Sequence, residues 1–217
     1  MVEVKICGLT RSIDAESADA AGAAYLGVIF AGGPRQRTPA EARAILSGRR
    51  GRKVGVFSTQ SIGEVADTAA AAGLDVVQLH ADALSDRVEA VRAATGLEVW
   101  AVIRSADGTL PDHAEDLAHA ADALLIDAKV DGALGGSGVT IPWGVLGESL
   151  DAMEAGHRII LAGGLTAENV ADAISYVSPM VVDVSSGVES APGVKDHARI
   201  RAFMAAVRAG SEPGDSG

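Results

Sequence analysis

The chain has 217 residues, of which 48% are hydrophobic and 22% are charged, a composition typical of one globular domain. The formal net charge of -11 and the pI of about 4.8 disfavour nucleic acids and anionic membranes as partners, because both attract clustered Lys and Arg. The sequence shows neither a membrane-spanning stretch nor a signal-peptide pattern, so we expect a cytoplasmic protein. The single cysteine, Cys7, excludes an internal disulfide.

Short apolar runs rich in β-branched residues alternate with Ala-rich segments of helical period. The predicted strands are Val2 to Ile6, Tyr25 to Phe30, Lys53 to Phe57, Val76 to Leu79, Glu98 to Ile103, Ala123 to Ile126, Arg158 to Leu161 and Met180 to Val184. The predicted helices are Ser12 to Ala21, Pro39 to Leu46, Ile62 to Ala72, Leu84 to Ala94, Asp112 to Ala121, Trp143 to Leu150, Ala167 to Ile174 and Val194 to Ala209.

Eight strand–helix units in this length predict an α/β fold, a single-domain (β/α)8 TIM barrel over residues 1–209. An open doubly wound sheet of the Rossmann type is the alternative. The polar residues 210–217 are expected to form a flexible tail, and the long loop 129–140 could act as a lid. Thr38 and Glu41 predict a capping box, Gly73 a left-handed helix end, and Thr166 a helix cap.

In a (β/α)8 barrel the active site lies at the carboxyl ends of the strands. Candidate side chains at these ends are Cys7, Arg35, Gln78, His80 and Asp127. Cys7 is either a core residue or a base whose thiolate is favoured by neighbouring N–H groups, and Asp127 is either solvated or an acid of raised pKa. Arg35 is either a solvated cation or a bidentate clamp for a carboxylate.

Three glycine-rich loops follow the last three predicted strands. They contain Gly136, the pair Gly163 and Gly164, and the run Ser186 and Gly187. Glycines and helix N-termini expose backbone N–H groups, which together predict a phosphate cradle, although such loops can also serve only as tight turns. The five histidines are scattered, so no metal site is predicted.

The motifs VKICGLT, VGVFSTQSIGEVADTAAAAGLDVVQLH, LLIDAK, GGSG, LAGGLTAENV and VDVSSGVES with PGVKD occur in this order along nearly the whole chain. In this order and spacing the chain resembles the phosphoribosylanthranilate isomerase family. The resemblance implies the third step of tryptophan biosynthesis from chorismate, a cofactor-free Amadori rearrangement. N-(5-phosphoribosyl)anthranilate would become 1-(2-carboxyphenylamino)-1-deoxyribulose 5-phosphate.

The resemblance also implies residue roles. Cys7 would be the general base at the second sugar carbon, Asp127 the general acid at the ring oxygen, and Arg35 the holder of the anthranilate carboxylate. The phosphate and the rest of the substrate would be bound by Gly136, Gly163, Gly164, Asp183, Ser186 and Gly187. Asp183 could also be structural.

The sequence departs from the family pattern at Ala81, at residues 139–142 and after Arg35, all at the rim of the predicted site. Two alternatives stay open. One is a dual-substrate isomerase that also acts on the histidine-pathway aminoaldose; the other is a non-catalytic barrel that binds a phosphorylated sugar. The expected partner is a phosphorylated aminosugar, and the chain is expected to be a monomer or a homodimer.

Overall fold

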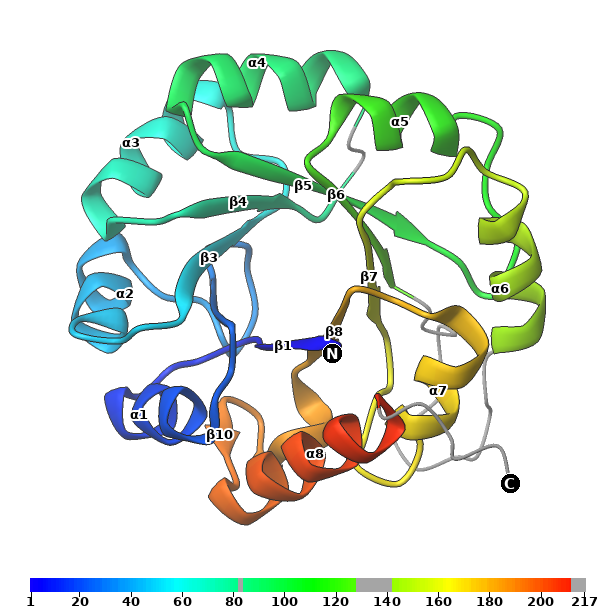
Figure 1. The fold of residues 1–217 in the computed structure, drawn as a ribbon. Helices are drawn as coiled ribbons and strands as arrows, with labels where there is room; N and C mark the ends of the chain where they lie inside the picture. Colours follow the sequence, from blue (N-terminus) through cyan, green and yellow to red (C-terminus); the bar gives the residue numbers. More distant parts are fainter. Residues whose placement is uncertain (82–83, 128–141, 212–217) are drawn as a thin grey trace.

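The computed structural model describes residues 1–81, 84–127 and 142–211. Eight parallel strands close into a barrel in chain order, with helices on its outside, so the predicted (β/α)8 fold is confirmed (Figure 1). The strands are β1 (Glu3–Ile6), β2 (Tyr25–Ile29), β3 (Arg52–Phe57), β4 (Val76–Leu79), β5 (Glu98–Arg104), β6 (Ala123–Asp127), β7 (Ile159–Ala162) and β8 (Val181–Val184).

The helices around the barrel are α1 (Ser12–Ala21), α2 (Pro39–Leu46), α3 (Ile62–Ala72), α4 (Ser85–Thr95), α5 (Ala114–Ala120), α6 (Trp143–Asp151), α7 (Val170–Val177) and α8 (His197–Gly210). Among the described residues, no helix is long and apolar enough to cross a membrane.

The strands β2 to β8 divide their apolar side chains between two clusters, because neighbouring residues of a strand point to opposite faces. On β1, Val4 and Ile6 join the large cluster between the barrel and the helices. The smaller cluster contains Trp100, Leu125 and Ile160 from β5, β6 and β7, and it fills the barrel interior. The inward positions nearer the carboxyl ends are polar, and Lys5, Gln78 and Asp183 are buried there. The apolar filling therefore supports a polar layer at the mouth.

Local signals set several helix boundaries. Thr38 forms the predicted capping box with Glu41, and Ser61 forms a second one with Glu64 at the start of α3. Gly73 ends α3 in the left-handed conformation, as predicted. The predicted cap at Thr166 is wrong: α7 starts after Asn169, whose side-chain oxygen accepts a hydrogen bond from the Thr166 N–H at 2.8 Å.

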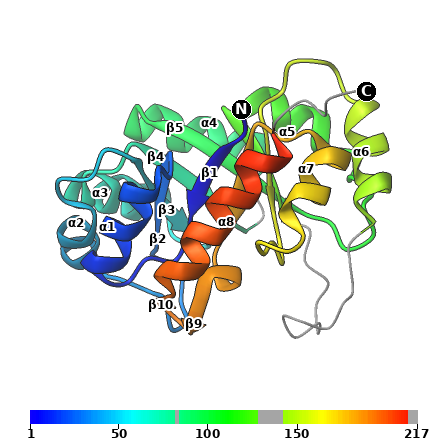
Figure 2. The same cartoon turned by 60° about the horizontal axis from the view of Figure 1, so that its bottom comes forward.

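Two short strands were not expected. β9 (Glu189–Ala191) and β10 (Val194–Lys195) form an antiparallel hairpin after β8, where the sequence predicted the beginning of the last helix. The helix begins at His197 instead, because Asp196 caps it by accepting hydrogen bonds from the N–H groups of Ala198 and Arg199. Figure 2 shows the hairpin at the end of the barrel opposite the N-terminus, which is the end where the parallel strands finish.

Candidate active site

Cys7 follows β1 at the mouth of the barrel. Its backbone N–H continues the ladder to β8 by donating to the Val184 carbonyl at 2.8 Å, and its side chain is 6% exposed. Lys5 lies two residues earlier on the same inward face, in register with Asp183 of β8. The Lys5 ammonium donates to Asp183 Oδ2 at 2.8 Å, and its charge also acts on the Cys7 thiol. The structure therefore surrounds the predicted base with a buried ion pair.

Burial raises the pKa of the Cys7 thiol, and the charge of Asp183 raises it further. The Lys5 ammonium acts in the opposite direction without reversing the shift. Burial lowers the pKa of Lys5, but Asp183 and Cys7 outweigh burial and leave that pKa raised. One of the two roles considered for Cys7 was that of a base whose thiolate is favoured by neighbouring backbone N–H groups. The structure corrects this expectation: the pKa of Cys7 is raised, and the principal groups that favour the charged form are lysines.

Arg35 lies in the segment after β2, and its guanidinium forms a two-bond pair with Glu189 of β9. Nε and Nη2 donate to the two carboxylate oxygens at 2.8 and 2.6 Å. The Lys195 ammonium donates to the same carboxylate at 3.0 Å and to the Ser185 carbonyl at 2.9 Å. Burial raises the pKa of Glu189, but Arg35 and Lys195 outweigh it and leave that pKa lowered. Arg35 is thus held in place at the mouth rather than solvated.

Asp127 is the last residue of β6, so β7 and β8 separate it from β1 and place it across the mouth from Cys7. Its Oδ2 lies 3.7 Å from His80 Nε2. His80 Nδ1 lies 3.4 Å from Gln78 Nε2, and Gln78 is 2% exposed. Burial lowers the pKa of His80, while the charge of Asp127 opposes that shift. The polar residues at the end of β4 therefore lie beside the predicted acid.

The glycine loops after β7 and β8 pack closely. Gly163 and Gly164 both have positive φ values, 97° and 65°, which suit successive backbone N–H groups that point to one side. Ser186 and Gly187 lie in a single 3₁₀ turn, η1 (Ser186–Val188). A methyl group at Gly187 would overlap the Leu165 carbonyl oxygen, so glycine is required for the two loops to meet. Gly136 and the predicted lid 129–140 lie outside the described residues.

Sequence reasoning missed Lys5, Glu189 and Lys195. Lys5 could have been found, because a lysine two residues before Cys7 on a strand must share its face. Lys195 belongs to the motif PGVKD, which had no residue role attached. Glu189 likewise belongs to the motif VDVSSGVES, but its partner Arg35 is 154 positions away in the chain, so the sequence did not show the pair.

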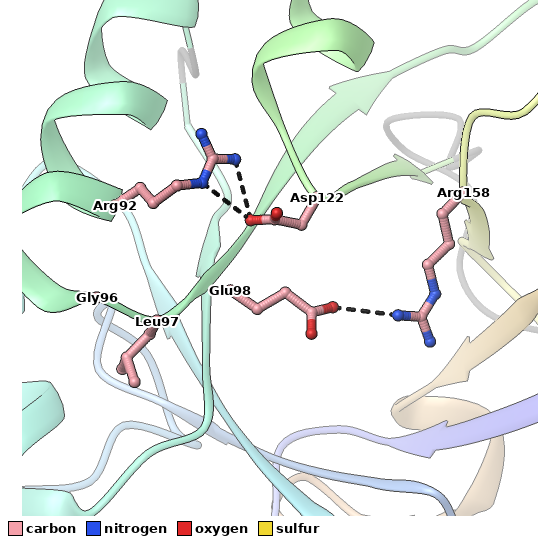
Figure 3. A pocket seen from close by; sticks show the side chains of 6 residues that line it. All are labelled: Arg92, Gly96, Leu97, Glu98, Asp122 and Arg158. Carbon is pink, nitrogen blue, oxygen red and sulfur yellow. Dashed lines mark hydrogen bonds and ion pairs between the residues drawn. The ribbon is translucent and has the colours of Figure 1, made fainter.

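A separate hollow of about 490 Å³ lies at the other end of the barrel (Figure 3). Glu98 begins β5, while Asp122 and Arg158 directly precede β6 and β7. The lining residues are Arg92, Gly96, Leu97, Glu98, Asp122 and Arg158. In Figure 3 Arg92 reaches Asp122 at 3.0 Å and Arg158 reaches Glu98 at 3.2 Å. Because this end of such barrels contributes stability rather than chemistry, the hollow is not the active site.

Three residues with metal-binding groups also come together, which the sequence did not indicate. Glu115, His119 and His157 each offer one ligand atom within 4.8 Å of the others. They already have partners: His157 Nε2 lies 2.8 Å from Glu115, and His119 Nε2 lies 3.3 Å from Glu154. His157 precedes β7, away from the mouth. The cluster ties α5 to the segment before β7 and takes no part in the site around Cys7.

Comparison with known proteins agrees with this geometry. The family model described as N-(5'phosphoribosyl)anthranilate (PRA) isomerase matches residues 4–206. The chain is 43% identical over 218 residues to the N-(5'-phosphoribosyl)anthranilate isomerase of Paracoccus denitrificans, covering 96% of this chain and 98% of that protein. It is 41% identical over 215 residues to the isomerase of Paramagnetospirillum magneticum, again covering 96% and 98%.

Solved structures give the same result. The phosphoribosyl anthranilate isomerase of Thermus thermophilus superposes with a TM-score of 0.82 at 36% identity, covering 96% of this chain and 99% of that one. An isomerase in complex with reduced 1-(o-carboxyphenylamino)-1-deoxyribulose 5-phosphate superposes with a TM-score of 0.79 at 29% identity, covering 96% and 100%. The chain therefore belongs to the N-(5'-phosphoribosyl)anthranilate isomerase family.

Proposed function

We propose that this chain is an aldose–ketose isomerase that converts N-(5'-phosphoribosyl)anthranilate into 1-(2-carboxyphenylamino)-1-deoxyribulose 5-phosphate without a cofactor. The family match and the names of the relatives support this activity. The observation that carries the assignment of roles is the placing of a thiol and a carboxylate, Cys7 and Asp127, across one barrel mouth. Such a pair suits proton transfers at neighbouring atoms of a sugar.

In the first step Asp127 donates a proton to the furanose ring oxygen as its bond to the first sugar carbon breaks. The electron pair of the anthranilate nitrogen forms a carbon–nitrogen double bond, which gives an open-chain iminium. The Cys7 thiolate then removes the proton from the second sugar carbon, and the released electron pair neutralises the iminium nitrogen. The resulting enolamine tautomerises to the ketone product.

Binding follows from the charges of the substrate. The guanidinium of Arg35 uses Nε and Nη2 for Glu189, so the substrate carboxylate is expected to approach Nη1. The backbone at Gly163, Gly164 and Gly187 is expected to hold the phosphate. The complex of a family member with a phosphorylated analogue supports a phosphate site in this fold.

The proposal includes a cytoplasmic location and a monomeric or homodimeric state. One similar structure is of monomers of the dimeric isomerase from Thermotoga maritima, with 31% identity and a TM-score of 0.79. The mass of this chain in solution, measured by light scattering after size-exclusion chromatography, decides between the two states.

The test is a fluorescence assay in which anthranilate and phosphoribosyl pyrophosphate form the substrate in situ and its disappearance is followed with a metal chelator present. Wild type should consume it, while Cys7→Ala and Asp127→Asn should lose about 10²–10⁴-fold in turnover and still bind a product analogue. An inert wild type would favour the non-catalytic barrel. Turnover of the histidine-pathway aminoaldose would revive the dual-substrate alternative, which the names of the relatives do not favour.

A further inference from the structure

Lys5 is a charged side chain that the reaction described above does not use. It is fully buried, and its ammonium contacts the Asp183 carboxylate at 2.8 Å and acts electrostatically on the Cys7 thiol. Burying an ion pair is expensive, and well-packed apolar residues often fill such a place without loss of stability. Asp183 Oδ1 is buried and has no hydrogen-bond partner among the described residues, so the pair is also incompletely satisfied. A contribution to stability alone therefore does not explain why a charged lysine is buried at position 5.

Gly27 on β2 has no side chain, which leaves room for the side chains of Lys5 and Cys7. A methyl group at Gly27 would lie 3.1 Å from Cys7 Sγ and 3.2 Å from Lys5 Cε. Both atoms thus lie over the same piece of backbone on the neighbouring strand. Because Lys5 and Cys7 share the inward face of β1, the ammonium that contacts Asp183 lies on the same side of the strand as the thiol.

We propose that Lys5 is a positioning residue for the general base: its ammonium stabilises the Cys7 thiolate, and Asp183 holds that ammonium in place. This inference rests on the base role proposed for Cys7. Lys5 keeps its proton throughout the reaction. The thiolate takes the proton from the second sugar carbon, and the neutral thiol then lies beside an unchanged ammonium.

The charged groups that act on the thiol come from four elements of the mouth. Lys5 and Lys195 lower its pKa, whereas burial and Asp183 raise it, and the charge of Arg35 interacts with the thiolate. Lys195 and Arg35 both bind Glu189. Of the three cations, Lys5 lowers the pKa of the Cys7 thiol the most. Removing Lys5 should therefore change the thiol more than a general loss of positive charge would.

The experiment titrates the thiol directly in the full-length chain. Because the sequence has one cysteine, the ultraviolet absorbance of the thiolate reports Cys7 alone, with Cys7→Ser as the blank. Lys5→Met should raise the pKa of the thiol enough to lower the thiolate fraction at neutral pH about tenfold or more. Asp183→Asn keeps an acceptor for the ammonium but removes the negative charge, so it should lower that pKa. Opposite shifts are the expected signature.

Controls separate electrostatics from folding. Lys53→Met removes a lysine on β3 that does not interact with the thiol and should leave the titration unchanged. Lys5→Arg should restore part of the wild-type titration, and the acid limb of the kcat/KM profile should follow the thiol pKa in each variant. Circular dichroism of the same samples verifies folding. If Lys5→Met does not fold, the thiol pKa of folded Asp183→Asn can still be compared with that of wild type.

A wild-type titration in folded Lys5→Met, or shifts of the same sign in Lys5→Met and Asp183→Asn, would overturn the proposal. If Lys5→Met does not fold, a thiol pKa in Asp183→Asn that equals or exceeds that of wild type overturns it. The titration needs no substrate, so it can refute the role of Lys5 whether or not the proposed function is correct. Opposite shifts in a protein without isomerase activity would refute the activity and leave the effect of Lys5 on Cys7 standing.

Discussion

Replacing Gly8 by alanine tests whether the mouth is assembled around the close approach of three loops. Gly8 directly follows Cys7 and has a φ of +71°, a conformation that costs an alanine about 1–2 kcal/mol. The added methyl group would lie 2.7 Å from Arg35 Cδ and 2.9 Å from Ser185 Oγ. Carbon atoms pack best at about 3.5–4.0 Å, so the Arg35 side chain must move and strain its pair with Glu189.

Gly48 provides a matched control. Its φ of +72° is nearly the same, but a methyl group there meets nothing within 4 Å. Gly48→Ala should therefore lose only the backbone cost of about 1–2 kcal/mol, while Gly8→Ala should lose about 1–3 kcal/mol more from overpacking. Urea denaturation with an unchanged slope measures the difference as a shift in midpoint. The KM for the substrate should rise in Gly8→Ala alone, and equal losses of stability in both variants would refute the reasoning.

Three further predictions concern Gly27 on β2, the surface residue His119 and the barrel-interior residue Leu125. Gly27→Ala should lower both kcat and stability, because the methyl group would press on the Cα and the sulfur of Cys7, each at 3.1 Å; an unchanged kcat in the steady-state assay counts against this packing. The backbone carbonyl of Glu115 and nearby carboxylates raise the pKa of His119, so this histidine stabilises the fold below about pH 6.5, and the effect is lost as pH rises through the raised pKa. His119→Gln should accordingly lower the melting temperature at about pH 5.5 and not at about pH 8.5, and a pH-independent difference in thermal melts contradicts it. Leu125→Ala should cost about 2–5 kcal/mol in denaturant unfolding, since Leu125 is 1% exposed inside the barrel, and a loss below about 1 kcal/mol would show that the interior collapses around the gap.

The barrel could be predicted because its signals are local and repeated. Eight apolar runs and eight helical periods each depend on residues close in sequence, and the capping box at Thr38 fixes the start of α2. The predicted ends of helices and strands were wrong where a contact with a residue distant in sequence decides them. Val194 and Lys195 were assigned to the last helix because β10 is too short to show a period, and its partner strand begins at Glu189.

The site was only partly predictable for the same reason. Position at a strand end was enough to predict that Cys7 and Asp127 lie at the same mouth, since the barrel topology alone brings such ends together. The direction of the pKa shift at Cys7 could not be predicted, because it depends on burial and on Asp183, which lies on another strand. Likewise, the sequence shows that Arg35 is a cation but not that Glu189 holds it.

The charges at the mouth reconcile an acidic protein with a doubly anionic substrate. The net charge is -11, yet around Cys7 the cations Lys5, Arg35 and Lys195 face the anions Asp183 and Glu189. Charges on the outer surface are screened over about 8 Å at physiological ionic strength, whereas these buried groups are screened much less. The cations placed beside Cys7, rather than the net charge, therefore provide the local attraction that an anionic substrate meets at the mouth. A salt series tests this argument: KM should vary weakly with ionic strength, because Lys5 and Lys195 are buried and Arg35 is only partly exposed.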